Sequence, residues 1–298
     1  MKIKEALESY LETESAQKGE KTKESDARFF KIVSHYFCEL LGMRKLKEIQ
    51  VEDLQKFHIW LSSEQVCGEF IKEPWIETTI SHNCQKLKAV FNKAERLERI
   101  ARNPARWWKV PKGESRERRP LTAEEFEKLA LNVPAWFLPI LQTLRLTGAR
   151  GASLASLEWS HVDFMQSRMT LLSKKGGRKR LKKIVIPLSH QLKEILLSIR
   201  PTGAIGPVFR DSKGNPITAQ LISTIGSQAK RKAGFPDDVV LYSLRHGFGT
   251  SLVEAGASPD VIRRLMGHSN LNQQLTYQKY ASLKPLEEAL ELVAGRLQ

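Results

Sequence analysis

The chain has 298 residues, of which 41% are hydrophobic and 27% are charged, and its formal net charge is +15. This length suffices for two domains with a sizeable core, and no apolar run approaches the roughly 20 residues that span a bilayer, which argues against an integral membrane protein. The excess of Lys and Arg predicts a polyanionic partner, with nucleic acid ahead of an anionic membrane surface.

The N-terminal 25 residues are polar and acidic and lack the apolar stretch of a signal peptide. We therefore expect a cytoplasmic protein. The three cysteines, Cys38, Cys67 and Cys84, have no metal-ligand spacing, so reduced structural thiols are predicted. Neither a P-loop nor a carboxylate cluster is found, and no metal or other cofactor is expected.

Helical periodicity dominates the first hundred residues. Residues 26–42 predict a helix that ends at Gly42, and residues 51–62 predict a second one. A third helix is predicted over 79–100, with Thr78 or Thr79 as its N-cap. Its apolar stripe consists of Ile80, Cys84, Leu87 and Phe91.

The polar face of this third helix carries three lysines, Lys86, Lys88 and Lys93. They are candidates for contact with a DNA backbone, and an ordinary solvated face is an equally good interpretation.

Prolines, a glycine and four arginines at 103–120 predict a linker, and its basic end carries Arg116, Arg118 and Arg119. A new helix follows, because Thr122 and Glu125 have the spacing of a capping box. We place the boundary between two domains, 1–112 and 113–298, in this linker.

The second half mixes helices and strands. Residues 133–147 predict a buried helix that leads into a Gly-Ala-Arg turn, and 168–173 and 183–188 predict two strands. The chain is expected to be helical again from 217 onward. Ser258 and Pro259 suit the start of a short helix that Gly267 ends.

A basic run, KKGGRKRLKK, lies between the two predicted strands at 174–183 and contains seven basic residues and no acid. Such a run is often only a solvated surface. The flanking strands favour a second interpretation, a hairpin that contacts phosphates through Lys175, Arg178, Lys179 and Arg180.

The segment LYSLRHGFGT at 241–250 places Arg245 among apolar residues and glycines that indicate a core. A buried arginine needs an anionic partner, and the segment itself contains no acid. An external anion could serve as the partner of Arg245. Tyr242 lies three residues before this arginine.

Four features follow one another along the chain: Thr-Gly-Ala-Arg ending at Arg150, the basic hairpin, Arg245-His246, and Gly267-His268 with Tyr277 nine residues after His268. This ordered set resembles the tyrosine recombinase, or phage integrase, family. The resemblance implies a mainly helical α+β fold. An N-terminal all-α core-binding domain would precede a C-terminal mixed α/β catalytic domain with a small antiparallel sheet.

The same resemblance implies a site-specific recombinase that cuts and rejoins duplex DNA through a 3′-phosphotyrosyl intermediate, without metal or ATP. Tyr277 would be the nucleophile, with Tyr280 as its rival. Arg150 and Arg245 would hold the phosphate through charge-assisted hydrogen bonds. Lys174 would be the general acid, with Lys175 the alternative.

His246 and His268 would hydrogen-bond the phosphate or position the tyrosine. Two positions depart from the family pattern. Tyr242 stands where the family usually has His, and Ser153 stands where it favours an acid. Because a phenol is a poor proton acceptor at neutral pH, these changes put the identity of the general base in question.

The partners implied are double-stranded DNA at specific sites and further copies of the chain, in a tetrameric synapse, with no membrane. Residues 284–298 predict an amphipathic helix that docks on the adjacent protomer or on its own domain. Two alternatives remain open: a DNA-binding relative that has lost catalysis, and a nicking-closing topoisomerase with the same chemistry.

Overall fold

The structure is a computed structural model that describes residues 1–63, 66, 70–71, 73, 75–113, 119–174, 181–236, 238–239, 241–268 and 277, with only the backbone of Lys174. The chain divides into two compact units, Met1–Arg116 and Glu117–Gln298. Over these described ranges, no helix is long and apolar enough to cross a membrane.

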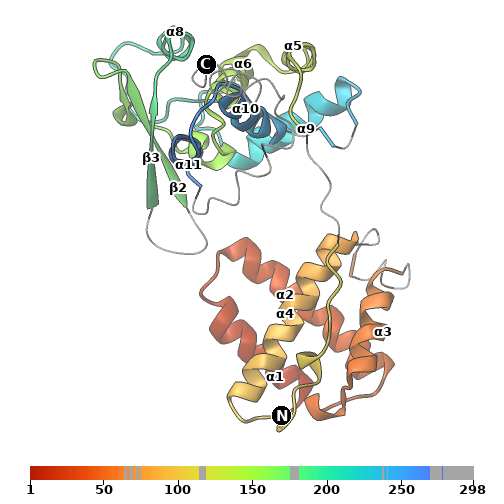
Figure 1. Ribbon diagram of the computed structural model, residues 1–298. Coiled ribbons are helices and arrows are strands. Elements are labelled where there is room, and N and C mark those ends of the chain that lie inside the picture. The colour runs from red at the N-terminus through yellow and green to blue at the C-terminus, as the bar shows by residue number, and fades with distance from the viewer. Residues whose placement is uncertain are drawn as a thin grey trace, which may run out of the picture. The chain divides into compact units, whose positions relative to one another are not determined.

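The N-terminal unit is a helical bundle (Figure 1). Its α-helices are α1 (Ile3–Tyr10), α2 (Glu20–Ser34), α3 (Val51–Leu61) and α4 (Glu77–Arg96). Short π-helical turns extend α1 through Leu11–Ser15 and α2 through His35–Leu40. The core is aromatic, and its largest fully buried side chains include Phe29, Phe37, Phe57, Phe91 and Trp108.

Helix boundaries in this unit differ from the sequence predictions. α2 begins at Glu20 rather than at residue 26. The sequence did not predict this start, because the first turn of the helix is exposed and has no apolar pattern. α4 begins at Glu77 after an extended Ile76, so the predicted threonine caps are wrong. The acidic Glu77 suits the positive end of α4, and its carboxylate also contacts His58 at 2.7 Å. The predicted stripe of α4 is buried as expected.

The predicted linker begins too early. Ala105 and Trp108 are buried in the N-terminal core, and Val110 packs against it. The Asn103 side chain accepts a hydrogen bond from the backbone N–H of Ala105 at 2.9 Å, which starts a 3-10 turn over Pro104–Arg106. Residues 103–110 therefore belong to the N-terminal unit, because burying Trp108 and Ala105 outweighs the tendency of Pro104 to favour an open connection.

The C-terminal unit combines helices with a small sheet, which lies along one side of the unit (Figure 1). The helices are α5 (Ala123–Ala130), α6 (Leu138–Thr147), α7 (Gly151–Ala155), α8 (His190–Ser198), α9 (Ala219–Lys232), α10 (Ser243–Glu254) and α11 (Pro259–Met266). The strands are β1 (Val162–Asp163), β2 (Arg168–Lys174) and β3 (Leu181–Pro187), in the order β1-β2-β3 and antiparallel throughout. This confirms the predicted fold class.

Local signals fixed several of these elements. Thr122 and Glu125 form the predicted capping box of α5. The Ser258 side chain accepts from the backbone N–H of Val261, and Gly267 ends α11 at a φ of 63°. α11 packs against β3, and α10 packs against α6. These contacts bring residues from four distant segments together.

Candidate active site

The predicted catalytic residues that the structure describes converge in the C-terminal unit. Arg150 lies at the N-cap of α7, directly after the turn at Gly148, whose φ is 57°. Arg245 lies in the first turn of α10. His268 follows α11, and Tyr277 contacts it. The glycine turn lets α6 end abruptly, so that Arg150 faces the same region as Arg245.

Arg245 is the most deeply buried cation of this group, at 3% exposure, and the burial expected from the sequence is confirmed. Its guanidinium donates to two backbone carbonyls, through Nη1 to Gly148 O at 2.5 Å and through Nη2 to Met266 O. Among the described residues, its Nε has no hydrogen-bond partner and no carboxylate forms an ion pair with the guanidinium. Burial, and then the nearby Arg150, lower the pKa of Arg245. The positive charge is therefore not neutralised by any described side chain.

Tyr277 and His268 form the central contact of the site. The Tyr277 hydroxyl lies 3.2 Å from Nε2 of His268, and the two rings stack with centroids 5.6 Å apart and an interplanar angle of 14°. Each residue is 3% exposed. The spacing of nine residues that singled out Tyr277 thus corresponds to a direct contact.

The close approach of Tyr277 to α10 depends on Gly249. A Cβ at this position would lie 2.7 Å from the Cδ1 atom of the Tyr277 ring. Even alanine at this position would push against the ring, so the glycine creates the space that Tyr277 occupies. The glycines of the segment suggested close packing, but the sequence could not show that the neighbour is Tyr277.

Burial and charge set the protonation states. Burial, followed by Arg245, Arg150 and Lys182, lowers the pKa of His268 to about 4, so its imidazole is neutral at pH 7. Burial raises the pKa of Tyr277, and Arg245 opposes this only in part. Without DNA, the site therefore holds a protonated phenol against a neutral imidazole.

Of the two departures from the family pattern, Tyr242 is linked to this contact through His246. Tyr242 is 40% exposed, and its ring meets His246 edge-on with centroids 5.1 Å apart. His246 in turn meets Tyr277 at 5.7 Å. Ser153 is buried in α7 at 4% exposure. His246 thus lies between Tyr242 and the tyrosine predicted to be the nucleophile.

The lysines of α4 are engaged within the N-terminal unit. Lys86 pairs with the buried carboxylate of Asp26 at 2.9 Å. Lys88 donates to Trp108 O at 2.9 Å, and Lys93 donates to Ser9 O at 2.9 Å. In the other unit, Arg119 pairs with Glu125 at 2.6 Å and with Asp238 at 3.2 Å.

Other predicted site residues lie outside the described residues. They are the side chain of Lys174, together with Lys175, Arg178, Lys179, Arg180, Arg116, Arg118, Tyr280 and the tail 284–298. The backbone of Lys174 ends β2 opposite Leu181.

One residue of the site was missed. Lys182 on β3 donates from Nζ to the backbone carbonyl of His268 at 3.0 Å. Strand alternation was the available signal, since Lys182 shares a strand face with the buried Ile184 and Ile186.

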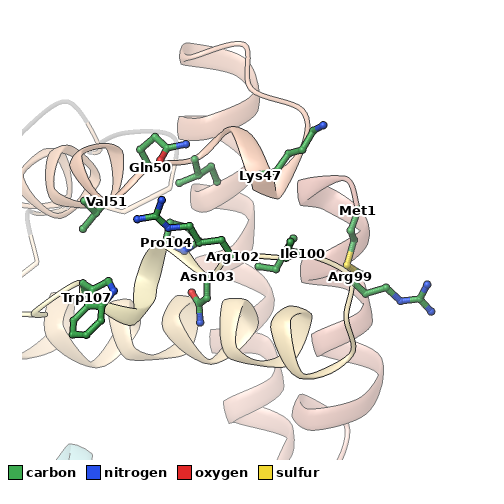
Figure 2. A pocket seen from close by; sticks show the side chains of 12 residues that line it. Met1, Lys47, Gln50, Val51, Arg99, Ile100, Arg102, Asn103, Pro104 and Trp107 are labelled. Carbon is green, nitrogen blue, oxygen red and sulfur yellow. The ribbon is translucent and has the colours of Figure 1, made fainter.

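A separate pocket in the N-terminal unit contains none of these residues (Figure 2). It lies between the segment before α3 and the segment after α4, where Lys47, Arg99 and Arg102 surround apolar side chains. Trp107 at its edge is 76% exposed.

Comparison with known proteins gives two family matches. The model of the phage integrase family matches residues 120–285, and the model of the phage integrase SAM-like domain matches residues 5–110. Tyrosine recombinase XerA of Pyrococcus furiosus is 31% identical over 219 residues, covering 70% of this chain and 71% of its own length. Tyrosine recombinase XerD of Mycobacterium tuberculosis strain H37Rv is 31% identical over 143 residues, and the match spans only 46% of either chain.

Solved structures share the fold. The Tn1549 transposon integrase in complex with transposon right end DNA superposes with a TM-score of 0.76 at 19% identity, covering 99% of this chain and 100% of its own. A lambda integrase tetramer bound to a Holliday junction gives 0.72 at 19% identity, covering 91% and 78%. With both units matched by family models and a 31% identical relative covered over most of its length, the chain belongs to the phage integrase family of tyrosine recombinases.

Proposed function

We propose that the chain is a site-specific DNA recombinase, which cuts and rejoins duplex DNA through a 3′-phosphotyrosyl intermediate. The contact between Tyr277 and His268, next to a buried Arg245 with no described carboxylate partner, is the observation that carries this proposal. Family membership supports the same reaction class. The relatives named above are recombinases and integrases, so neither the inactive relative nor the topoisomerase is favoured.

Arg150 and Arg245 would bind the scissile phosphate. Attack on a phosphodiester builds negative charge on its non-bridging oxygens, and preorganised donors are worth about 3–4 kcal/mol each in such a transition state. Two backbone carbonyls already fix the Arg245 guanidinium, while its Nε is left without a described partner. The phosphate would supply the missing anion.

Tyr277 would attack phosphorus through its Oη. A bond forms between Oη and phosphorus, the bond between phosphorus and the 5′-oxygen breaks, and Oη gives its proton to Nε2 of His268. Lys174 would give a proton to the departing 5′-oxygen, with Lys175 as the alternative. Reversal of these steps rejoins the strand without ATP, because the phosphotyrosine bond keeps the energy of the broken bond.

His268 is our choice as proton acceptor because position 242 holds a phenol. Tyr242 can donate a hydrogen bond to a phosphate oxygen but accepts a proton poorly at neutral pH. His268 touches the Tyr277 hydroxyl, and its lowered pKa, about 4, keeps the imidazole neutral above that pH. In the tautomer that carries its hydrogen on Nδ1, Nε2 can accept the Tyr277 proton. Cleavage should therefore persist to lower pH than an ordinary histidine base, with a pKa near 6.5, would permit.

The substrate would be paired DNA sites held in an assembly of several protomers, with the N-terminal unit as the core-binding domain. Lambda integrase crystallises as a dimer on a core site and as a tetramer on a Holliday junction. We assign backbone contact to the hairpin residues Lys175, Arg178, Lys179 and Arg180 and to the linker residues Arg116 and Arg118. The α4 lysines are already held inside their own unit. The cytoplasm is the expected compartment.

Substitution of the nucleophile tests the function. Duplexes cut from the DNA that flanks the gene, carrying a nick beside each candidate cleavage position, should trap a covalent protein–DNA adduct on a denaturing gel. Tyr277→Phe should abolish the adduct and keep half-site binding, while Tyr280→Phe should form it. Adduct formation by Tyr277→Phe but not by Tyr280→Phe would contradict the assignment.

A further inference from the structure

Two cationic side chains donate hydrogen bonds to backbone carbonyls at and just after the C-terminal end of α11. Arg245, from α10, donates through Nη2 to Met266 O, the carbonyl of the last helical residue. Lys182, from β3, donates through Nζ to His268 O at 3.0 Å, two residues further on. Carbonyls at a helix C-terminus carry partial negative charge and have no partner within the helix, so cationic donors stabilise them.

The turn at Gly267 brings this end of α11 directly onto β3. Gly267 has a φ of 63°, and a Cβ there would lie 2.2 Å from Cδ1 of Ile184. Ile184 and Lys182 lie two residues apart, so they share the inner face of β3. Two neighbouring residues are therefore held against β3: Gly267 by packing against Ile184, and His268 by the hydrogen bond from Lys182.

We propose that Lys182 is a positioning residue for the strand-cleavage reaction: by fixing the backbone of His268 on β3, it keeps the imidazole against the Tyr277 hydroxyl. This inference rests on the proposed function for its catalytic consequence. Its structural part concerns the protein alone. In this scheme Lys182 acts through His268 rather than on the reacting atoms.

The charge of Lys182 also favours a reactive His268, because it helps to keep the imidazole neutral. Among the described residues, the groups that face His268 are Tyr277, Arg245 from α10, Arg150 before α7 and Lys182 from β3. The three cations disfavour a protonated imidazole and add to the effect of burial. Removal of the Lys182 charge should raise the pKa of His268 above its value of about 4. A larger share of His268 would then be protonated, and unable to act as a base, at about pH 4 to 5.

A direct contact of Lys182 with DNA is the main alternative, since Lys182 belongs to the basic run at 174–183. The two roles differ in what they predict. A phosphate ligand contributes to affinity, and its loss lowers the slope of log Kd against log salt by about 1. A positioning residue leaves that slope unchanged and alters the behaviour of His268.

The first test needs no DNA. The imidazole signals of the full chain are followed by NMR between pH 4 and 8, with His268 assigned by comparison with His268→Gln. In the wild type, His268 should remain neutral through most of this range. Lys182→Gln, which keeps a donor but loses the charge, should bring the midpoint up by about half a unit or more. Lys182→Arg should titrate like the wild type.

Lys183→Gln is the matched control, because it removes the same charge from the exposed face of the same strand. Its His268 titration should coincide with that of the wild type. An unchanged His268 midpoint in Lys182→Gln, or an equal shift in Lys183→Gln, would overturn the proposal, whatever the enzymatic activity proves to be.

The second test measures adduct formation on the nicked duplex in single turnovers. Lys182→Met should slow it about tenfold or more, and Lys182→Arg should restore most of the rate. For Lys182→Gln, the acid limb of the pH–rate profile should move to higher pH, so that the loss is larger near pH 4.5 than at pH 7. A slower rate with an unmoved profile and a reduced salt slope would assign Lys182 to DNA binding and overturn the inference. Absence of an adduct in the wild type would count against the proposed function, while the NMR titration would still decide the role of Lys182.

Discussion

The two units treat buried charge differently. In the N-terminal unit, the fully buried Asp26 carboxylate accepts from Ser15 at 2.8 Å and pairs with Lys18 at 2.6 Å and Lys86 at 2.9 Å. In the C-terminal unit, the buried Arg245 donates to two backbone carbonyls and forms no ion pair with a carboxylate of the described residues. A buried carboxylate that pairs with cations stabilises the fold. A buried cation without a carboxylate partner is available to bind an anionic ligand.

Removal of the Arg245 charge should produce the largest effect. Arg245→Ala is expected to lower the rate of adduct formation about a thousandfold, with a much smaller loss of half-site affinity, because the guanidinium meets charge that grows in the transition state. Arg245→Lys should remain strongly impaired, since an ammonium lacks the planar fork that reaches both Gly148 O and Met266 O. Single-turnover rates and gel shifts on one half-site provide the measurement.

Arg263→Ala is the control for this change, because Arg263 is partly exposed and pairs locally with Asp260 on α11. Its cleavage rate should stay near that of the wild type. Equal losses of affinity and rate in Arg245→Ala would mean that Arg245 serves binding alone, and the contrast between the units would then fail.

Asp26→Asn should destabilise the N-terminal unit by about 3 kcal/mol, because it leaves two lysines beside a buried neutral amide. Burial alone would raise the pKa of Asp26, but hydrogen bonds from Lys18, Lys86 and Ser15 outweigh it and lower the pKa overall. This stabilisation is present above the unfolded-state pKa of about 4 and is lost as pH falls through the folded-state value. Urea unfolding at pH 7 and below pH 4 should show the difference between variant and wild type shrinking with acid.

Glu20→Gln on the same helix is the comparison for Asp26→Asn, since its carboxylate is exposed and pairs with the partly exposed Lys23. It should change stability by less than about 0.5 kcal/mol. If Asp26→Asn were as stable as the wild type, the Asp26 cluster would not stabilise the N-terminal unit. Lys86 would then again be a candidate for DNA contact.

Gly249→Ala should impair cleavage without removing any charge. The added methyl group would overlap the Tyr277 ring, and overpacking of this kind costs about 1–3 kcal/mol, so we expect the ring to leave its place beside His268. Gly247→Ala is the matched control, because a Cβ there meets only Pro120 at 3.9 Å. Adduct yield with unchanged half-site binding is the readout, and equal yields from the two variants would refute the close-packing argument.

Tyr242→His should have the smallest effect, a change of a few-fold or less, in either direction. The exposed position accommodates an imidazole, which can donate to the same phosphate oxygen and can also accept a proton. If His268 is the base, the pH–rate profile should barely move. A new limb near pH 6.5 would show that position 242 had taken over the proton.

Residues with a local cause were predictable from the sequence. The capping box at Thr122, the Ser258 cap and the Gly267 stop depend on neighbours within four residues, and the structure has all three. α1 was missed although Ile3, Ala6, Leu7 and Tyr10 follow helical spacing, because the acidic composition of the segment obscured the pattern.

Contacts between distant residues could not be predicted in the same way. Lys86 finds its carboxylate 60 positions away on α2, and Lys182 finds its carbonyl 86 positions away. Tertiary packing alone creates these pairs, and a lysine on a polar helix face or in a basic run looks the same in the sequence whether it meets solvent, DNA or a buried partner. The burial of Arg245 was visible only because its neighbours are apolar.

The two carbonyls that hold Arg245 also affect how fast a bound complex can become reactive. A freely rotating arginine loses about 2 kcal/mol of rotamer entropy when it is immobilised. Here Gly148 O and Met266 O restrict those rotations when the chain folds. An arriving phosphate therefore meets a guanidinium that is already ordered, and its binding free energy can go into aligning the DNA strand rather than into ordering the protein.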